Sequence, residues 1–276
     1  MKFGVREVAD VMLKAKVDNQ VVGNKKFSKG QPVCHFNSLK TSTVEGAATT
    51  VYAQGGKGNP RLIAWEGERT LTFTMEDALI STMGIAILTG AGLIEAGKDN
   101  AGSIAQHIVE TVKAGEEGSI TVTHTIADIG DTDIWVCKLD DEGNPTGDFI
   151  EGTGTEGGKT ITASGVTAND YVMVDYYTER TAGLTQIDIE PNKFGGNYYL
   201  EGSTLFREQS TGKDMPAEFI LPNCKVQSNF TFTMASSGDP STFTFTVDAF
   251  PGVTKYDLSK KVLCAIQMFE ESEAKN

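Results

Sequence analysis

The 276-residue sequence predicts a mainly β protein, all-β or α+β, with one helix and a small inserted β-sandwich lobe. Three observations predict this class. Apolar and threonine residues alternate with period two over several segments, which is typical of half-buried strands. Gly, Asp, Asn and Pro clusters separate these segments as turns, and only one segment has clear helical spacing.

The alternation is strongest at residues 70–75 and in two later segments. In the first, Leu71, Phe73 and Met75 interleave with threonines. Residues 229–234 and 242–247 repeat the pattern on either side of a turn at Ser236–Pro240. Because Thr and Phe favour a pleated surface and the Gly-Asp-Pro turn favours a chain reversal, Asn229–Ala249 is predicted to form a long hairpin.

One segment, Glu76–Thr89, has the spacing of a helix. Its apolar residues at helical intervals are Leu79, Met83, Ala86 and Ile87. Thr74, with Asp77 three residues on, predicts the N-terminal cap, and Gly90 and Gly92 predict the end. The glycine at position 84 and the β-branched isoleucines lower helix propensity, so a buried strand is the competing interpretation.

Residues 115–180 differ in pattern from the rest of the chain, with short strands between Gly, Asp and Asn turns. This range is predicted to be a small Ig-like β lobe inserted into a discontinuous β core of residues 1–114 and 181–276. The strands predicted within the lobe are Ser119–Ile126, Asp133–Leu139, Lys159–Ala163 and Tyr171–Tyr177. Longer strands are predicted after it at Leu184–Ile189, Tyr198–Glu208, Met215–Leu221 and Val262–Phe269.

The formal net charge is −13. This balance excludes a general nucleic-acid binder, which needs clustered Lys and Arg to neutralise phosphates. The start Met1–Glu7 lacks the apolar core of a secretory signal, so synthesis in the cytoplasm is expected. The longest apolar stretch, Ala78–Leu93, is too short and too rich in Gly, Ser and Thr for a membrane helix.

No catalytic, cofactor-binding or metal-binding residues are predicted. The four cysteines lie far apart without a CxxC pair and are expected to be buried free thiols: Cys34, Cys137, Cys224 and Cys264. The histidines, His35, His107 and His124, lack metal-ligand spacing. No hydrolase or metalloprotease signature occurs, although carboxylates paired only by folding stay open.

Four other motifs have simpler explanations. Gly152–Thr160 resembles a phosphate-binding loop but has Thr153 where that loop needs glycine. Gly55–Pro60 is predicted to be a turn at a subunit contact, and Asp140–Asn144 a solvated turn without the ligand spacing of an EF-hand. Asn229–Thr231 matches a glycosylation sequon by chance.

Regular amphipathic hairpins with exposed edges indicate an assembly module, since free strand edges can pair with a neighbouring chain. At this level of detail the sequence resembles phage virion proteins of the tail tube type. The resemblance covers about two thirds of the chain by order and pattern and contains no diagnostic short motif. The segments that carry it are Met1–Val8, Leu39–Ala48 with Tyr52–Gly56, Leu62–Thr74, and Phe219–Phe230 with the hairpin that follows.

The resemblance implies a tail-tube-type barrel or sandwich of two packed antiparallel β-sheets flanked by one helix. It also implies a non-enzymatic subunit that stacks as hexameric rings in the virion tail, beside sheath, tape measure and tail terminator proteins. DNA would pass through an acidic lumen without specific binding, in agreement with the net charge. The hairpin and turn residues Leu39–Gln54 and Asn229–Ala249 are the candidate lumen wall and ring contacts. The lobe at residues 115–180 departs from the simplest tube subunits and leaves open whether a contractile sheath surrounds the tube.

Two alternative functions are compatible with the same sequence. The first is another virion component, such as a capsid decoration or cement protein. The second is a carbohydrate-binding module or glycan hydrolase, in which Trp65, Trp135, Tyr176 and Tyr177 would line a groove with paired carboxylates; at strand spacing such aromatics are more often core residues. A phage tube and the tube of a bacterial injection device are not distinguished, nor are the host and the ring number.

Overall fold

The computed structural model describes residues 2–5, 7–98, 102–127, 133–238 and 241–269. The chain forms two compact units, and each is described by itself. The first consists of Met1–Leu93 and Ile187–Asn276, and the second of Ile94–Gln186. The predicted lobe of residues 115–180 falls within the range of the second unit, and its status as an inserted domain stays a prediction.

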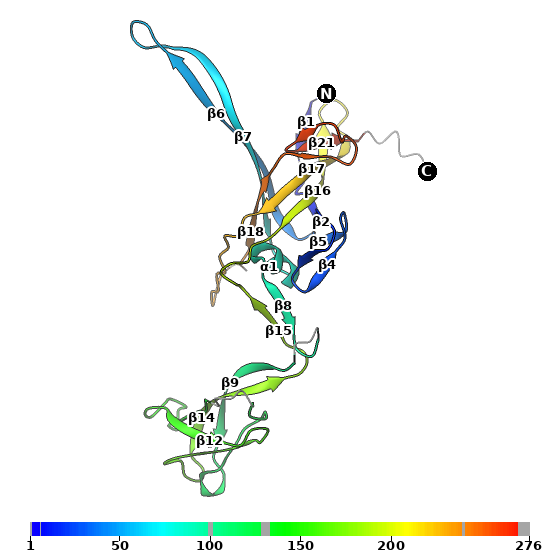
Figure 1. The fold of residues 1–276 in the computed structure, drawn as a ribbon. Coiled ribbons are helices and arrows are strands. Elements are labelled where there is room, and N and C mark those ends of the chain that lie inside the picture. Colours follow the sequence, from blue (N-terminus) through cyan, green and yellow to red (C-terminus); the bar gives the residue numbers. More distant parts are fainter. Residues whose placement is uncertain (1, 6, 99–101, 128–132, 239–240, 270–276) are drawn as a thin grey trace. The chain divides into compact units, whose positions relative to one another are not determined.

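Most of the first unit is one large antiparallel sheet with the strand order β5-β2-β16-β17-β18-β7-β6, on which β1 pairs with β16 and β21 with β17 (Figure 1). Its strands are β1 (Phe3–Val5), β2 (Asp10–Ala15), β5 (Pro32–Phe36), β6 (Leu39–Gln54), β7 (Arg61–Asp77), β16 (Asn197–Glu208), β17 (Asp214–Val226), β18 (Phe243–Ala249) and β21 (Ala265–Met268). Short two-stranded ladders use β3 (Gln20–Val22) with β4 (Lys25–Phe27), β19 (Gly252–Val253) with β20 (Lys261–Val262), and β8 (Gly92–Glu95) with β15 (Thr185–Asp188).

The alternating residues of these strands build the core. In β2, Val11, Leu13 and Ala15 are buried while the residues between them are not. Phe73 and Phe245 are also fully buried, on β7 and β18. The prediction of a mainly β, antiparallel protein with one helix is therefore confirmed, and the large sheet curls into a half-barrel.

The helix α1 (Thr82–Thr89) is shorter than predicted and begins six residues later. Asp77 belongs to β7, and its carboxylate accepts hydrogen bonds from the Ser38 hydroxyl and the Leu79 amide. The chain thus bends at Asp77, and Ser81 rather than Thr74 provides the cap, accepting a 2.9 Å hydrogen bond from the amide of Gly84.

Gly90 ends the helix, as the sequence predicted. Its φ of 71° lies in the left-handed region, and its amide donates to the carbonyl oxygen of Ala86. An added Cβ would also lie 2.4 Å from the carbonyl carbon of Phe194. Position 90 therefore requires glycine for both its backbone conformation and its packing.

The predicted hairpin Asn229–Ala249 is only half correct. β18 forms as expected, but residues 229–234 form no strand, and β17 and β7 are the partners of β18. The aromatic ring of Phe232 instead contacts the rings of Phe230 and Phe243 edge to face. The turn at Ser236–Pro240 lies partly outside the described residues.

The second unit is built around an antiparallel sheet with the order β10-β13-β12-β11-β14-β9. Its strands are β9 (Ile104–Lys113), β10 (Ile120–Thr121), β11 (Trp135–Lys138), β12 (Ile150–Gly154), β13 (Thr160–Ala163) and β14 (Tyr171–Arg180), with a 3-10 turn, η1, at Glu116–Gly118. β9 is absent from the sequence predictions, and the strand predicted at 119–126 is reduced to β10. Gly152–Thr160 is a hairpin turn between β12 and β13 rather than a phosphate-binding loop.

A partly buried hydrogen-bond network joins the two end strands of this sheet. Tyr176 on β14 is fully buried and donates a 2.7 Å hydrogen bond to Glu110 on β9. Glu110 also accepts a hydrogen bond from the amide of Thr123, just after β10. Burial opposes the ionisation of Glu110, but these hydrogen bonds lower its pKa on balance.

We predict that Tyr176→Phe destabilises the second unit by about 1–3 kcal/mol, because it leaves the Glu110 carboxylate without a buried donor. The measurement is urea unfolding followed by fluorescence in a Trp65→Phe background, where Trp135 is the remaining tryptophan. Tyr177→Phe, the neighbour on the opposite sheet face, is the control and is expected to change stability by less than about 0.5 kcal/mol. Equal effects of both substitutions would contradict the role given to the Tyr176 hydroxyl.

Candidate assembly surface

Three neighbouring strands of the first unit, β6, β7 and β18, present a surface of short polar side chains. The pairing of these strands aligns their outward-facing residues in three rows across the sheet. The residues between those positions face the core; they include Phe73, Met75, Phe245 and Val247. The residues in the three rows, named here the threonine face, are Thr41, Glu76 and Thr244; Thr43, Thr74 and Thr246; and Glu45, Thr72 and Asp248.

The threonine face is acidic. Its ionisable groups within these three strands are Glu45, Glu76 and Asp248, and the first cation along a row is Lys225 of β17, opposite Asp248. The Thr41 hydroxyl bonds to the Glu76 carboxylate at 3.3 Å. Hydroxyls and carboxylates in this arrangement hold a hydrated surface that repels phosphate at short range, within a Debye length of about 8 Å at physiological salt.

Beyond this face, β6 and β7 continue as a two-stranded ribbon that no third strand covers. β18 pairs with β7 only over Thr72–Asp77, and β6 lies at the edge of the sheet. Residues 47–70, named here the arm, project from the body (Figure 1), with both faces exposed along most of their length. The arm takes eight residues from β6, Ala47–Gln54, and ten from β7, Arg61–Thr70, and the eight residues of β6 span about 25 Å. The turn predicted at Gly55–Pro60 forms the tip of the arm.

One face of the arm is apolar. Cross-strand pairing aligns Val51 with Trp65 and Ala53 with Ile63, and these four residues are named the apolar strip. Val51, Ile63 and Trp65 are 65%, 55% and 54% exposed. Exposed apolar residues grouped in this way mark an interaction surface, and an isolated two-stranded ribbon is only marginally stable in water. The arm therefore has the properties of a segment that is completed by a partner.

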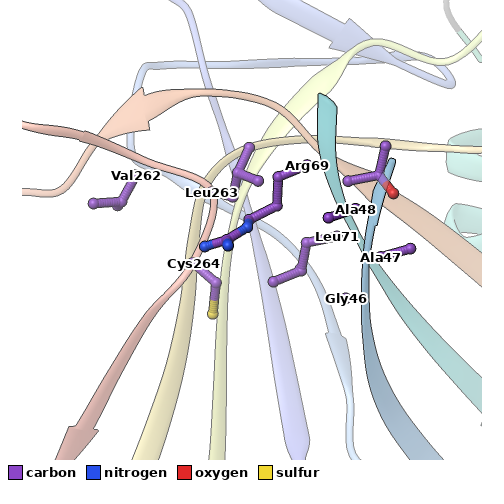
Figure 2. Close-up of a pocket in the computed structure, with 9 residues that line it drawn as sticks. Gly46, Ala47, Ala48, Arg69, Leu71, Val262, Leu263 and Cys264 are labelled. Atoms are coloured by element: carbon purple, nitrogen blue, oxygen red, sulfur yellow. The ribbon is translucent and has the colours of Figure 1, made fainter. Parts of the chain in front are cut away.

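A groove of about 580 Å³ lies where the arm leaves the body. The groove is lined by Gly46–Ala48 of β6 on one side and by Val262–Cys264 on the other, and Figure 2 shows the Arg69 side chain extending toward the second segment. Leu71 adds an apolar side chain to the wall. The groove is thus mainly apolar, with one cation that can pair with a carboxylate of an occupant.

The structure brings together only part of the sequence-predicted surface. Leu39–Gln54 contributes to the threonine face and to the arm, and β18 contributes one further strand. Residues 229–234 do not join the ladder, although Phe230 and Phe232 stay partly exposed beside it. The alternating threonines were visible in the sequence, but the register that aligns them was not.

The four aromatics considered for a glycan groove do not line one. Tyr176 is buried, and Trp65 belongs to the apolar strip. Among the described residues, no group of three or more His, Cys, Asp and Glu side chains is placed to hold a metal ion. Asp140–Asn144 is a solvated turn in which the Asp140 carboxylate accepts from the amides of Glu142 and Asn144.

All four cysteines are free thiols, as predicted. Cys137 and Cys224 are buried, whereas Cys34 and Cys264 are partly exposed, so burial was correctly predicted for only two. No helix within the described ranges has both the length and the apolar character needed to cross a bilayer.

The fold and this surface define a mainly β protein with an exposed two-stranded arm. A family model described as the YomU/Tube protein family matches residues 3–260, and the chain belongs to this family. The family name indicates a tube protein, consistent with a structural component of the phage virion tail, and it confirms the resemblance drawn from the sequence. No curated protein matches the chain significantly.

Cys264 provides a chemical probe of the groove. Burial raises the pKa of its thiol, so less of the reactive thiolate is present at pH 8. We predict that iodoacetamide labels Cys264 several-fold more slowly in the folded monomer than in the denatured chain, as measured by peptide mass spectrometry. Labelling should accelerate as the pH rises. Equal rates in folded and denatured protein would show that the groove does not shield the thiol.

Proposed function

We propose that the chain is a non-enzymatic subunit of a phage tail tube, made in the host cytoplasm, that self-assembles into stacked rings around a lumen for DNA. The observation that carries the proposal is the arm with its apolar strip, in a chain that belongs to a tube family. Six subunits per ring is the number implied by the resemblance to tail tube proteins.

The apolar strip and the groove support association between copies. They are different surfaces of one chain, so pairing them between copies gives a heterologous, head-to-tail contact. Such a contact closes into a ring or continues as a filament, depending on the rotation between subunits. Burying the strip in a neighbour's groove would also cover strand edges that otherwise invite uncontrolled pairing.

The threonine face supports the role of lumen wall. A surface for sliding DNA needs hydration, short side chains and a charge that repels phosphate, and the three rows combine these properties. The arm itself carries three basic and two acidic residues, so it lacks the acidic character expected of that wall. We therefore assign ring contacts to the arm and the lumen to the threonine face.

The other proposed partners are those that the resemblance to tail tube proteins implies. Sheath, tape measure and tail terminator proteins would contact the assembled tube, and DNA would pass without base-specific contacts. We propose that the second unit is an insertion that decorates the tube exterior. A capsid decoration protein is the main alternative, and it would leave the purified chain as a monomer or small oligomer.

We predict that concentrated wild-type protein forms rings or hollow rods, and that Ile63→Ser with Trp65→Ser abolishes them by removing the apolar strip. Because both side chains are exposed, the double substitution should change the free energy of unfolding by less than about 1 kcal/mol. Negative-stain electron microscopy and mass photometry measure assembly. Val21→Thr, at an exposed residue of β3, is the control and should assemble normally. A wild-type chain that stays monomeric and binds empty capsids would favour decoration.

A second prediction concerns lumen charge. Tubes of the Glu45→Lys/Asp248→Lys variant should retain fluorescent double-stranded DNA that wild-type tubes release, and added salt should weaken the retention. The control, Glu151→Lys/Glu156→Lys, makes the same charge change at exposed positions of the second unit. DNA retention by both variants to the same extent would exclude the threonine face as the lumen wall.

A further inference from the structure

A second pocket in the first unit has a composition that is unusual for so acidic a chain. It has a volume of about 340 Å³ and lies beside β16. Its wall consists of apolar residues and three lysines, with a buried tyrosine among them. Its main lining residues, named here the lysine pocket, are Lys16, Lys29, Lys255, Tyr199, Val253 and Leu258. This volume is near the lower end of the range of about 300–1,000 Å³ for ligand sites, which suits a short peptide segment.

The aromatic ring of Tyr199 lies beneath two of the cations. The ammonium groups of Lys255 and Lys16 lie 5.1 Å and 6.0 Å from the ring centroid. Tyr199 is 7% exposed, and its buried hydroxyl oxygen forms no hydrogen bond of full geometry among the described residues. Burial raises the pKa of this hydroxyl, while the nearby backbone of Lys255 lowers it. A buried hydroxyl without a hydrogen bond of full geometry is a costly feature that a bound polar group would relieve.

The positive charge of the pocket is only partly neutralised within the chain. Lys255 forms a 3.2 Å ion pair with Glu201, which also pairs with Lys14. The Lys16 ammonium donates to the carbonyl oxygen of Pro222, and no described carboxylate forms an ion pair with Lys16 or Lys29. Burial and the nearby Lys29 ammonium together lower the pKa of Lys16. An anion held between the two lysines would remove this repulsion.

The chain contains a segment of the complementary charge. Residues 270–273, outside the described residues, read Glu-Glu-Ser-Glu, with three carboxylates in four positions. They follow Phe269, whose amide donates to the carbonyl oxygen of Pro216 at the end of β21. The acidic segment is therefore attached to a defined point on the large sheet.

The register of the sheet separates this point from the pocket of the same chain. Pro216 pairs with Leu205, which lies six residues along β16 from Tyr199, a distance of about 20 Å. β21 pairs with β17 and runs away from Tyr199. Each extended residue adds at most about 3.6 Å, so the backbones of Glu271 and Glu273 stay within about 7 Å and 14 Å of Phe269. Both distances fall short of the backbone of Lys16, which follows the Ala15–Tyr198 pair at the far end of β16.

We propose that the lysine pocket binds the acidic segment Glu270–Glu273 of a neighbouring copy of the chain. The carboxylates lie between Lys16 and Lys29, and the methylene groups of the glutamates cover the apolar part of the wall. The inference rests on the proposed self-association, and it adds a second, electrostatic contact to the one made by the arm. Assembly should accordingly depend on ionic strength as well as on the apolar strip.

The test that needs no assembly uses a peptide of residues 269–276 and, as host, the Glu270→Gln/Glu271→Gln/Glu273→Gln variant of the full chain. Because its tails lack these glutamates, the tails of other host copies do not compete with the peptide. Fluorescence anisotropy should show binding about tenfold tighter than for the same peptide with the three glutamates replaced by glutamine. Lys29→Gln in the host should remove that difference. Lys26→Gln, at an exposed lysine outside the pocket, should keep it. Equal binding of both peptides to the host would overturn the proposal.

A second measurement tests whether this contact forms between two copies or within one chain. Equal amounts of ¹⁴N- and ¹⁵N-labelled wild-type chains are assembled together and treated with a carbodiimide that joins lysine to carboxylate. Mixed-isotope products between Lys16 or Lys29 and Glu270 or Glu271 are expected. Only same-isotope products would overturn the inter-copy contact. If rings form but yield none of these products, the role of the lysine pocket is wrong and the proposed function stands. If the chain binds the peptide but never assembles, the proposed function is wrong and the pocket's affinity for the acidic segment stands.

Discussion

The antiparallel register of β7 between β6 and β18 determines most of the surface of the first unit. Thr74 lies opposite both Thr43 and Thr246, while the adjacent residue Phe73 faces the core. A slip of one residue in either ladder would bring the threonines inside and the aromatic side chains outside. The same pairing thus produces a packed core and a uniform hydrated face.

The arm is a consequence of where this pairing stops. β18 accompanies β7 only as far as Thr72, after which β6 and β7 have no other neighbour. Along β6, Val51 and Ala53 continue the side that carries Thr41 and Thr43, so the strand changes from polar to apolar where the arm begins. In the arm these apolar residues have no third strand to pack against among the described residues. The exposed apolar side chains of β6 and β7 are therefore concentrated on the arm, and the threonine face carries polar side chains only.

The two contacts proposed between copies differ in their chemistry. The strip and groove are mainly apolar, so their association should tolerate salt, whereas the lysine pocket relies on charge. An acidic chain that self-associates must overcome mutual repulsion, and in the proposed arrangement a local group of lysines would reduce it where two copies meet. Assembly would then be compatible with a strongly negative surface.

Sequence patterns predicted some elements well because local and tertiary forces agreed there. Phe243, Phe245 and Val247 alternate and form β18. Residues 229–234 have the same alternation, yet the ladder between β17 and β18 covers only Cys224–Val226 and does not continue into them. The helix was placed too early because Asp77 can cap a helix in sequence, whereas in the structure its carboxylate bonds to Ser38 and closes the end of β7.

The sequence by itself determined the β class, the free thiols, the acidic balance and the turn at Gly55–Pro60, because these depend on residue type and short-range backbone preference. Only the tertiary structure decided which strands pair, where the arm leaves the sheet, and which lysines gather around Tyr199. Those features depend on registers between segments up to about 200 residues apart, such as β2 and β16. Period-two alternation specifies the two faces of a strand but not its neighbour, and the neighbour decides whether a face is buried or exposed.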